Sequence, residues 1–163
     1  MKQLWAPWRM PYLRGECAKV DGCLFCHKLT QDDAVEHVLY RGARCFVVLN
    51  RFPYNNGHMM VVPYAHTGLL EALNDETLLE MMQLVRHCLH FLRKVYEPHG
   101  FNVGVNEGSA AGAGIAEHIH LHIVPRWNAD VNYMTVVGET RVVPESLDDT
   151  YATFRPLFDG LHE

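Results

Sequence analysis

Three histidines alternate with aliphatic residues in the segment HIHLHI at 118–123. Successive residues of a β-strand point to opposite faces, so one face would carry three imidazoles spaced about 7 Å apart. The aliphatic side chains on the other face indicate burial against a core, which leaves the imidazole face open or covering something polar. Such a set of imidazoles can hold a metal ion, or one of them can act as a nucleophile that the others orient.

A pair of cysteines, Cys23 and Cys26, forms a second chemical motif. The two-residue gap allows both thiolates to bind one zinc ion, but no second pair of this kind exists, so further ligands would have to come from distant residues. Buried or redox-active thiols are the alternative interpretation. The chain has five cysteines and a beginning without a secretory h-region. We therefore expect reduced thiols in a cytoplasmic protein rather than a disulfide framework.

The elements that must position these motifs can be predicted from periodicity and from turn residues. Asn74 is a good N-cap for the clearest helix, and Pro98 and Gly100 stop it. Strands followed by one long helix and further strands indicate an α+β domain. The predicted elements are a hairpin at 38–49, a strand at 59–62, a helix over about 75–97, a strand at 101–105, a small-residue loop at 107–114, the histidine strand at 118–123, a short strand at 140–143 and a helix from Pro144 to about Phe158.

One face of the long helix is predicted to be buried, because apolar residues recur at steps of three and four. Cys45 in the hairpin and Cys88 in the helix fit buried apolar positions. The predicted buried positions of the helix are Leu78, Met81, Met82, Val85, Cys88, Leu89, Leu92 and Val95.

Composition sets limits on the function. The 163 residues, with 48% hydrophobic and 20% charged residues, suit one globular domain. No apolar run approaches the roughly 18 residues that span a bilayer, and the net charge of −5 disfavours mainly electrostatic nucleic-acid binding. We expect no membrane and no nucleic-acid partner. The expected organisation is a single domain over 1–163, with an irregular N-terminal arm at 1–35, a core at 36–128 and a tail at 129–163.

The histidine segment resembles the signature of the histidine triad (HIT) family, in which three histidines alternate with hydrophobic residues and two more hydrophobic residues follow. The match at 118–124 is accompanied upstream by LNR at 49–51, GH at 57–58 and VVP at 61–63, which resemble the strand–loop–strand of the Fhit branch. The similarity covers about residues 20–128. It implies a HIT-like fold, namely an antiparallel sheet with one long helix packed on it and a short C-terminal helix.

Both ends of the chain, LWAPWRMPYL and PRWNADVNYM…GETRVVPESL, are similar to a bacterial subgroup described as diadenosine tetraphosphate phosphorylase-like. This resemblance implies an enzyme that cleaves dinucleoside polyphosphates at the α-phosphate and forms a covalent adenylyl-histidine, which phosphate or water then resolves. Hydrolysis of adenosine 5′-phosphoramidates is the enzymatic alternative. A nucleotide-sensing binding protein with slow catalysis is the alternative from another class. The family also implies a homodimer that joins two sheets, and no organic cofactor.

Four histidines take the catalytic positions of the family. His120 matches the nucleophile, and an imidazole that is largely neutral at pH 7 suits this role. His122, together with backbone amides of the preceding loop, would stabilise charge on the phosphoryl oxygens. His58 would orient the site through hydrogen bonds, and His118 completes the catalytic group.

The resemblance also assigns substrate-binding positions. Asn50 matches a ribose-binding position. Asn106 stands where the Fhit branch has a glutamine that contacts phosphate, and the shorter side chain is a departure from that branch. Ser109, Gly112 and Gly114 would line the path of the polyphosphate.

Some bacterial HIT proteins complete a zinc site with two histidines, and the matching residues here are His66 and His118. Together with Cys23 and Cys26 they would form a closed Cys2His2 set of the structural type. A zinc-bound His118 could not act freely as an acid or a base, so the chemistry would fall to the other histidines.

Overall fold

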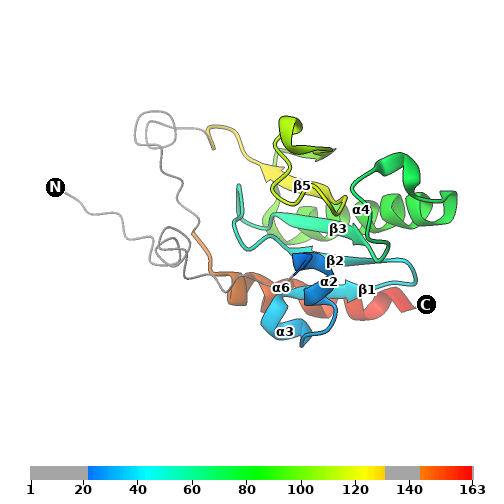
Figure 1. The fold of residues 1–163 in the computed structure, drawn as a ribbon. Helices are drawn as coiled ribbons and strands as arrows, with labels where there is room; N and C mark the ends of the chain where they lie inside the picture. The colour runs from blue at the N-terminus through cyan, green and yellow to red at the C-terminus, as the bar shows by residue number, and fades with distance from the viewer. Residues whose placement is uncertain (1–21, 131–143, 163) are drawn as a thin grey trace.

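Five strands form one antiparallel sheet in the computed structural model, which describes residues 22–130 and 144–162 (Figure 1). The strand order is β1-β2-β3-β5-β4. The predicted α+β fold is confirmed, with one long helix and a C-terminal helix. The elements are α2 (Leu24–Lys28), α3 (Asp33–Glu36), β1 (Val38–Arg41), β2 (Cys45–Leu49), β3 (Met59–Pro63), α4 (Asp75–Tyr96), β4 (Gly100–Val105), β5 (Leu121–Arg126) and α6 (Leu147–Phe158), with single 3₁₀ turns at Leu70–Ala72, Ser109–Ala111 and Asp159–His162.

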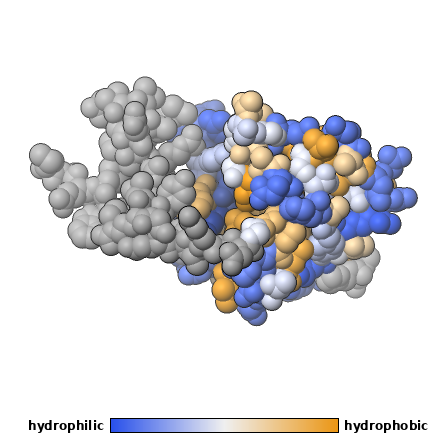
Figure 2. Space-filling view, in the orientation of Figure 1, coloured by the Kyte–Doolittle hydropathy of each residue, from blue (hydrophilic) through white to orange (hydrophobic). Residues whose placement is uncertain are grey.

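The sheet is covered on both faces, which explains why all five residues of β2 are buried. Cys45, Val47 and Leu49 pack into the core beneath α4 and α6, whereas Phe46 and Val48 pack with Phe25 of α2. Figure 1 views the sheet from the side of α2, and in the same view apolar side chains gather over the middle of the described part (Figure 2). None of the described helices is long and apolar enough to cross a membrane.

The long helix α4 begins as predicted, because the Oδ1 atom of Asn74 accepts a hydrogen bond from the Thr77 amide at 2.9 Å. Most of its predicted core positions are buried or packed against the core, including Cys88. Met82 was predicted wrongly, since 55% of this residue is exposed, while Leu84 is 4% exposed and occupies the core. A helix turns about 100° per residue, so Met82, directly after the buried Met81, lies outside the buried stripe.

The N-terminal arm, predicted to be irregular, contains two short helices within its described part. Asp32 caps α3 by accepting hydrogen bonds from the amides of Ala34 and Val35 at 2.9 and 3.3 Å. The buried Lys28 at the end of α2 pairs with Glu36 at the end of α3 and fixes the two helices together. At the other end of the chain, α6 begins at Leu147, three residues after the predicted start at Pro144, and the Ser146 side chain caps it. Residues 1–21 and the predicted strand at 140–143 lie outside the described residues.

Leu92 tests how much the contact between α4 and the sheet contributes to stability. Its side chain is fully buried in the main core, so Leu92→Ala is expected to lower the free energy of unfolding by about 2–5 kcal/mol. Urea denaturation measures the loss. Met82→Ala on the exposed side of the same helix is the matched control, with an expected change within about 0.5 kcal/mol. Equal losses in the two variants would contradict the assignment of the buried face.

Candidate active site and metal centre

The histidine segment keeps its predicted alternation, although only its second half belongs to the sheet. The ladder of β5 begins at Leu121, so His118 and His120 precede the strand. Ile119, Leu121 and Ile123 all belong to the core beneath α4. The imidazoles therefore lie on the opposite face, as the period of two requires.

From the sequence we expected this imidazole face to be open or to cover a polar group, but it is covered by α2 at His118 and His120, while His122 stays partly exposed. His118 is fully buried and His120 is 4% exposed, because α2 covers them. The ring of Phe25 lies with its centroid 4.9 Å from that of His120 and 5.4 Å from that of His118. Sequence reasoning missed Phe25, and its place between the two cysteines was the signal that could have found it.

Hydrogen bonds fix which nitrogen of His120 carries the proton. Its Nδ1–H group donates to the His118 carbonyl at 2.8 Å, so the Nε2 atom keeps a lone pair. Burial lowers the pKa of His120, and the bond to the carbonyl partly opposes this effect. The imidazole is therefore neutral near pH 7, which a nitrogen nucleophile requires.

A relay of hydrogen bonds orients His122 in the same manner. The Tyr54 amide donates to Nδ1 of His58 at 3.1 Å, so the proton of His58 is at Nε2. This Nε2–H group donates to Nδ1 of His122 at 3.0 Å, which places the proton of His122 at its own Nε2 atom. His122 is thus a neutral donor beside His120, with 4.7 Å between the ring centroids.

The lowered pKa of His122 predicts how the stability of the fold depends on pH. Burial, aided by the neighbouring His120, lowers the pKa of His122 from 6.5 to about 4. The unfolded chain therefore binds more protons than the folded chain between these values, so the stability linked to His122 is complete above pH 6.5 and is lost as the pH falls toward 4. His122→Gln is expected to flatten the decline of the free energy of unfolding in this range, measured by urea denaturation. His90→Gln on the exposed side of α4 is the control, and an unchanged slope in His122→Gln would refute the linkage.

Asn50 lies against His58 in the structure. Its Nδ2 atom is 3.3 Å from Nδ1 of His58, and its Oδ1 atom accepts from the Phe52 amide at 2.9 Å. The Asn50 amide nitrogen is a donor facing Nδ1 of His58, so it favours the same tautomer as the Tyr54 amide does, with the proton at Nε2. The ribose-binding role of Asn50 stays a prediction.

A cavity of about 240 Å³ opens beside His122, along β4 and β5. Asn106 lines it, as its predicted contact with substrate requires. Ser109 begins the 3₁₀ turn that follows, and Gly112 caps its end with a φ of 86°, which favours glycine. Ser109, Gly112 and Gly114 are not among the residues that line this cavity, so their contacts with substrate stay predictions.

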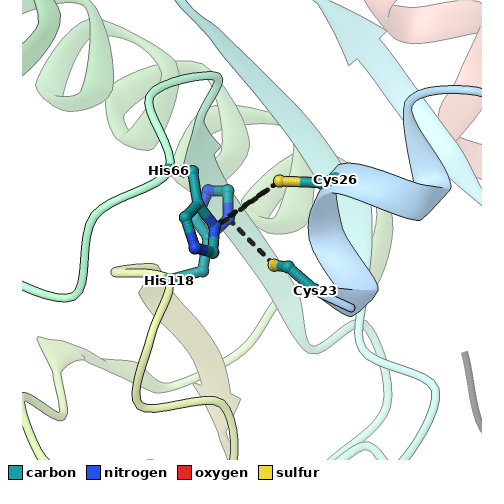
Figure 3. Close-up of side chains that lie close together, drawn as sticks. All are labelled: Cys23, Cys26, His66 and His118. Carbon is teal, nitrogen blue, oxygen red and sulfur yellow. Dashed lines mark hydrogen bonds between the residues drawn. The ribbon is translucent and has the colours of Figure 1, made fainter. Parts of the chain in front are cut away.

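The four predicted metal ligands converge at one point between α2, the end of β3 and the start of the histidine segment (Figure 3). The Nδ1 atom of His118 is 3.2 Å from Sγ of Cys23, 3.7 Å from Sγ of Cys26 and 3.3 Å from Nδ1 of His66. The Cys26 sulfur is 3.5 Å from Nδ1 of His66.

These distances fit a tetrahedral zinc ion. Zinc at its usual bond lengths separates a sulfur from a nitrogen ligand by about 3.6 Å and two nitrogens by about 3.4 Å. The Nε2–H group of His118 donates to the Pro63 carbonyl at 2.9 Å, which leaves Nδ1 as the ligand atom and fixes its direction. The four side chains could therefore hold a metal ion, and an ion bound by all four would have no open position for a substrate.

Comparisons with known proteins agree with this geometry. Residues 31–129 match the HIT domain family. A Mycobacterium tuberculosis protein named AP-4-A phosphorylase is 40% identical over 157 residues, which cover 92% of this chain and 80% of that protein. The asymmetrical bis(5′-nucleosyl)-tetraphosphatase of Schizosaccharomyces pombe is 31% identical over 76% of this chain and 68% of its own length.

Among solved structures, a zinc-bound histidine triad family protein from Mycobacterium smegmatis superposes with a TM-score of 0.69 at 26% identity. The match covers 86% of this chain and 96% of that chain. Its bound zinc is consistent with the metal site described above. The match over residues 31–129 and the identity of 40% to a full-length relative lead to one conclusion: the chain belongs to the HIT family.

Proposed function

We propose that this enzyme cleaves dinucleoside polyphosphates, with diadenosine tetraphosphate as the preferred type, through an adenylyl group carried on His120. One observation carries the proposal: the ring of His120, whose Nε2 atom is unprotonated, lies 4.7 Å by centroids from the ring of His122, whose proton is at Nε2, and hydrogen bonds set both tautomers. The names of the relatives, a phosphorylase and a tetraphosphatase, support the class of substrate.

The first step is a displacement at the α-phosphorus. The Nε2 lone pair of His120 forms the P–N bond while the bond from phosphorus to the bridging oxygen breaks, and ATP departs with that electron pair. The imidazole becomes positive, and its Nδ1–H bond to the His118 carbonyl stabilises this charge. His122 donates its Nε2–H group to the phosphoryl oxygens, where negative charge increases.

The second step releases the adenylyl group from His120. An oxygen of inorganic phosphate attacks the α-phosphorus and gives ADP, or water attacks and gives AMP, while the P–N bond breaks and its electron pair returns to His120. The phosphorylase relative, at 40% identity, favours phosphate.

Product analysis with and without inorganic phosphate tests this function. Incubation with diadenosine tetraphosphate and separation of the nucleotides by chromatography should give ATP and ADP only when phosphate is present. ATP and AMP in both cases would identify a hydrolase of the same class. Absence of turnover, combined with cleavage of adenosine 5′-phosphoramidate, would contradict the proposed substrate class.

We also propose that the metal of the Cys2His2 site is zinc with a structural role. Four protein ligands of this type bind zinc in closed sites, where the ion links segments of the chain and stabilises the fold. Here it would fasten α2 to the histidine segment. His118 would then serve as a ligand, and His58, His120 and His122 would carry the chemistry.

A homodimer is the proposed assembly. Among the described strands, β4 lies at one edge of the sheet, and Val103 in it is 43% exposed. An unpaired edge with an apolar residue favours pairing with a second copy, which would extend the sheet across both chains. Light scattering coupled to size-exclusion chromatography should give twice the mass of one chain.

A further inference from the structure

The orientation of His58 depends on the loop at 50–57, which connects β2 to β3. The Tyr54 amide, which donates to Nδ1 of His58 at 3.1 Å, belongs to this loop, and the loop contains neither helix nor strand. Within it, the His58 amide donates to the Asn55 carbonyl at 3.2 Å, and the Asn50 amide donates to the His58 carbonyl at 2.9 Å. These bonds close the loop on itself, so contacts outside it must fix the position of its tip.

Asn55 ties the tip of this loop to the strand that carries His122. Its Nδ2 group donates to the Pro125 carbonyl of β5 at 3.0 Å and to Oδ2 of Asp130 at 2.9 Å. Arg126, also in β5, donates to both carboxylate oxygens of Asp130 at 2.6 and 2.8 Å and holds the pKa of this carboxyl well below its usual range. Asp130 is therefore an ionised and fixed acceptor near neutral pH, and both bonds of Asn55 hold the loop against β5.

Asn56 ties the same tip to the two helices on the other face of the sheet. Its Nδ2 group donates to Oε2 of Glu145 at 2.9 Å, and a carboxylate only accepts, so the amide has one orientation. Its Oδ1 atom is buried and has no hydrogen-bond partner among the described residues, which is unfavourable and leaves the bond to Glu145 as the contact that holds the side chain. Glu145 also accepts from the hydroxyl of Tyr96 in α4 and from that of Thr150 in α6, the latter at 3.0 Å. The carboxylate thus joins the loop to both helices.

Gly57 brings the loop close to α4 immediately before His58. Its φ of 72° favours glycine, and a Cβ atom here would lie 2.8 Å from side-chain atoms of Leu92 and Tyr96. The backbone therefore has no room to move toward the helix. Together with the bonds of the two asparagines, this contact fixes the segment that carries the Tyr54 amide.

We infer that Asn55 and Asn56 are positioning residues, which fix the tautomer of His122 through the loop that they anchor. The inference rests on the proposed function for its effect on the rate, whereas the tautomer can be measured without a substrate. If the tip shifts, Nδ1 of His58 loses the bond from the Tyr54 amide, and either nitrogen of this ring can then carry the proton. A His58 with its proton at Nδ1 offers a lone pair to His122, which then carries its own proton at Nδ1 and has none at Nε2.

The consequence for the reaction is loss of the donor to the phosphoryl oxygens. His122 donates there only with its proton at Nε2, and negative charge increases there during the displacement, so the loss falls on kcat rather than on KM. The Asn50 side chain, whose Nδ2 atom is 3.3 Å from Nδ1 of His58, remains and keeps part of the original preference. We therefore expect a mixture of tautomers rather than a complete exchange.

Two single variants, Asn55→Ala and Asn56→Ala, test the inference, and either is sufficient if the other does not fold. Long-range proton–nitrogen NMR spectra of the isotope-labelled, metal-loaded full-length protein distinguish protonated from unprotonated ring nitrogens near neutral pH. The wild type should show His58 and His122 with their protons at Nε2 alone, and each variant should show both tautomers. With diadenosine tetraphosphate as substrate, kcat of each variant should fall by about 10-fold, while KM changes by less than about twofold.

Thr150→Val is the matched control, because it removes a donor to Glu145 from α6 and leaves the loop intact. It should lower the thermal midpoint but keep the tautomers and the kcat of the wild type. A lower midpoint with unchanged tautomers in the asparagine variants would show a merely structural role and overturn the inference, as would mixed tautomers in Thr150→Val. If the wild type does not turn over diadenosine tetraphosphate while the asparagine variants still shift the tautomers, the positioning role holds and the proposed function fails.

Discussion

Replacement of His120 by alanine is expected to lower kcat for diadenosine tetraphosphate by about 10⁴-fold or more, because it removes the nitrogen proposed to form the bond to phosphorus. His122 stands beside it but carries its proton at Nε2, since its Nδ1 atom accepts from His58. It therefore has no lone pair to offer on the substrate side. Initial rates measured by chromatography, on protein shown to be folded by its thermal midpoint, give the loss.

The covalent intermediate gives an independent measurement for the same variant. Rapid quenching and intact-mass spectrometry should detect an adenylylated chain in the wild type and none in His120→Ala. His90→Ala, on the exposed side of α4, is the control and should retain both the rate and the adduct. A His120→Ala protein with full turnover would eliminate the nucleophilic mechanism.

The parts of the fold that were predicted correctly depend on local signals. The predicted N-cap Asn74 accepts from an amide three residues away, so the sequence contains the whole interaction. The alternation at 118–123 likewise depends only on the period of an extended chain. These signals were sufficient for the long helix and the two faces of the histidine segment, whereas the C-terminal helix begins three residues after its predicted start.

What the sequence did not show depends on partners far away in the chain. His66 joined the metal ligands only through the family resemblance, because its spacing from Cys23 and Cys26 carries no signal of its own. Phe25 and Tyr54 contact histidines of the candidate active site that lie far along the chain, so only the folded sheet brings them together. The covering of His120 by α2 was missed for the same reason.

Replacement of Cys23 by alanine is expected to remove the metal and to lower the thermal midpoint by about 10 °C or more. The site links α2 to His118, so its loss frees a segment that covers one face of the sheet. Phe25 lies on this segment against His120, and we therefore expect kcat to fall as well, by about 10-fold, well below the loss in His120→Ala. Elemental analysis of the purified protein measures zinc per chain, and differential scanning fluorimetry measures the midpoint.

Cys88→Ala separates the metal from the general cost of losing a buried thiol. Cys88 is fully buried beneath the sheet, outside the cluster, so its truncation should lower the midpoint while the zinc content stays at one ion per chain. Excess chelator should lower the midpoint of the wild type and of Cys88→Ala, but should leave Cys23→Ala unchanged. A Cys23→Ala protein with full zinc content would show that the ion is held elsewhere. Loss of zinc with an unchanged midpoint would show that the ion does not fasten α2, because a ligand that binds only the folded chain must stabilise it.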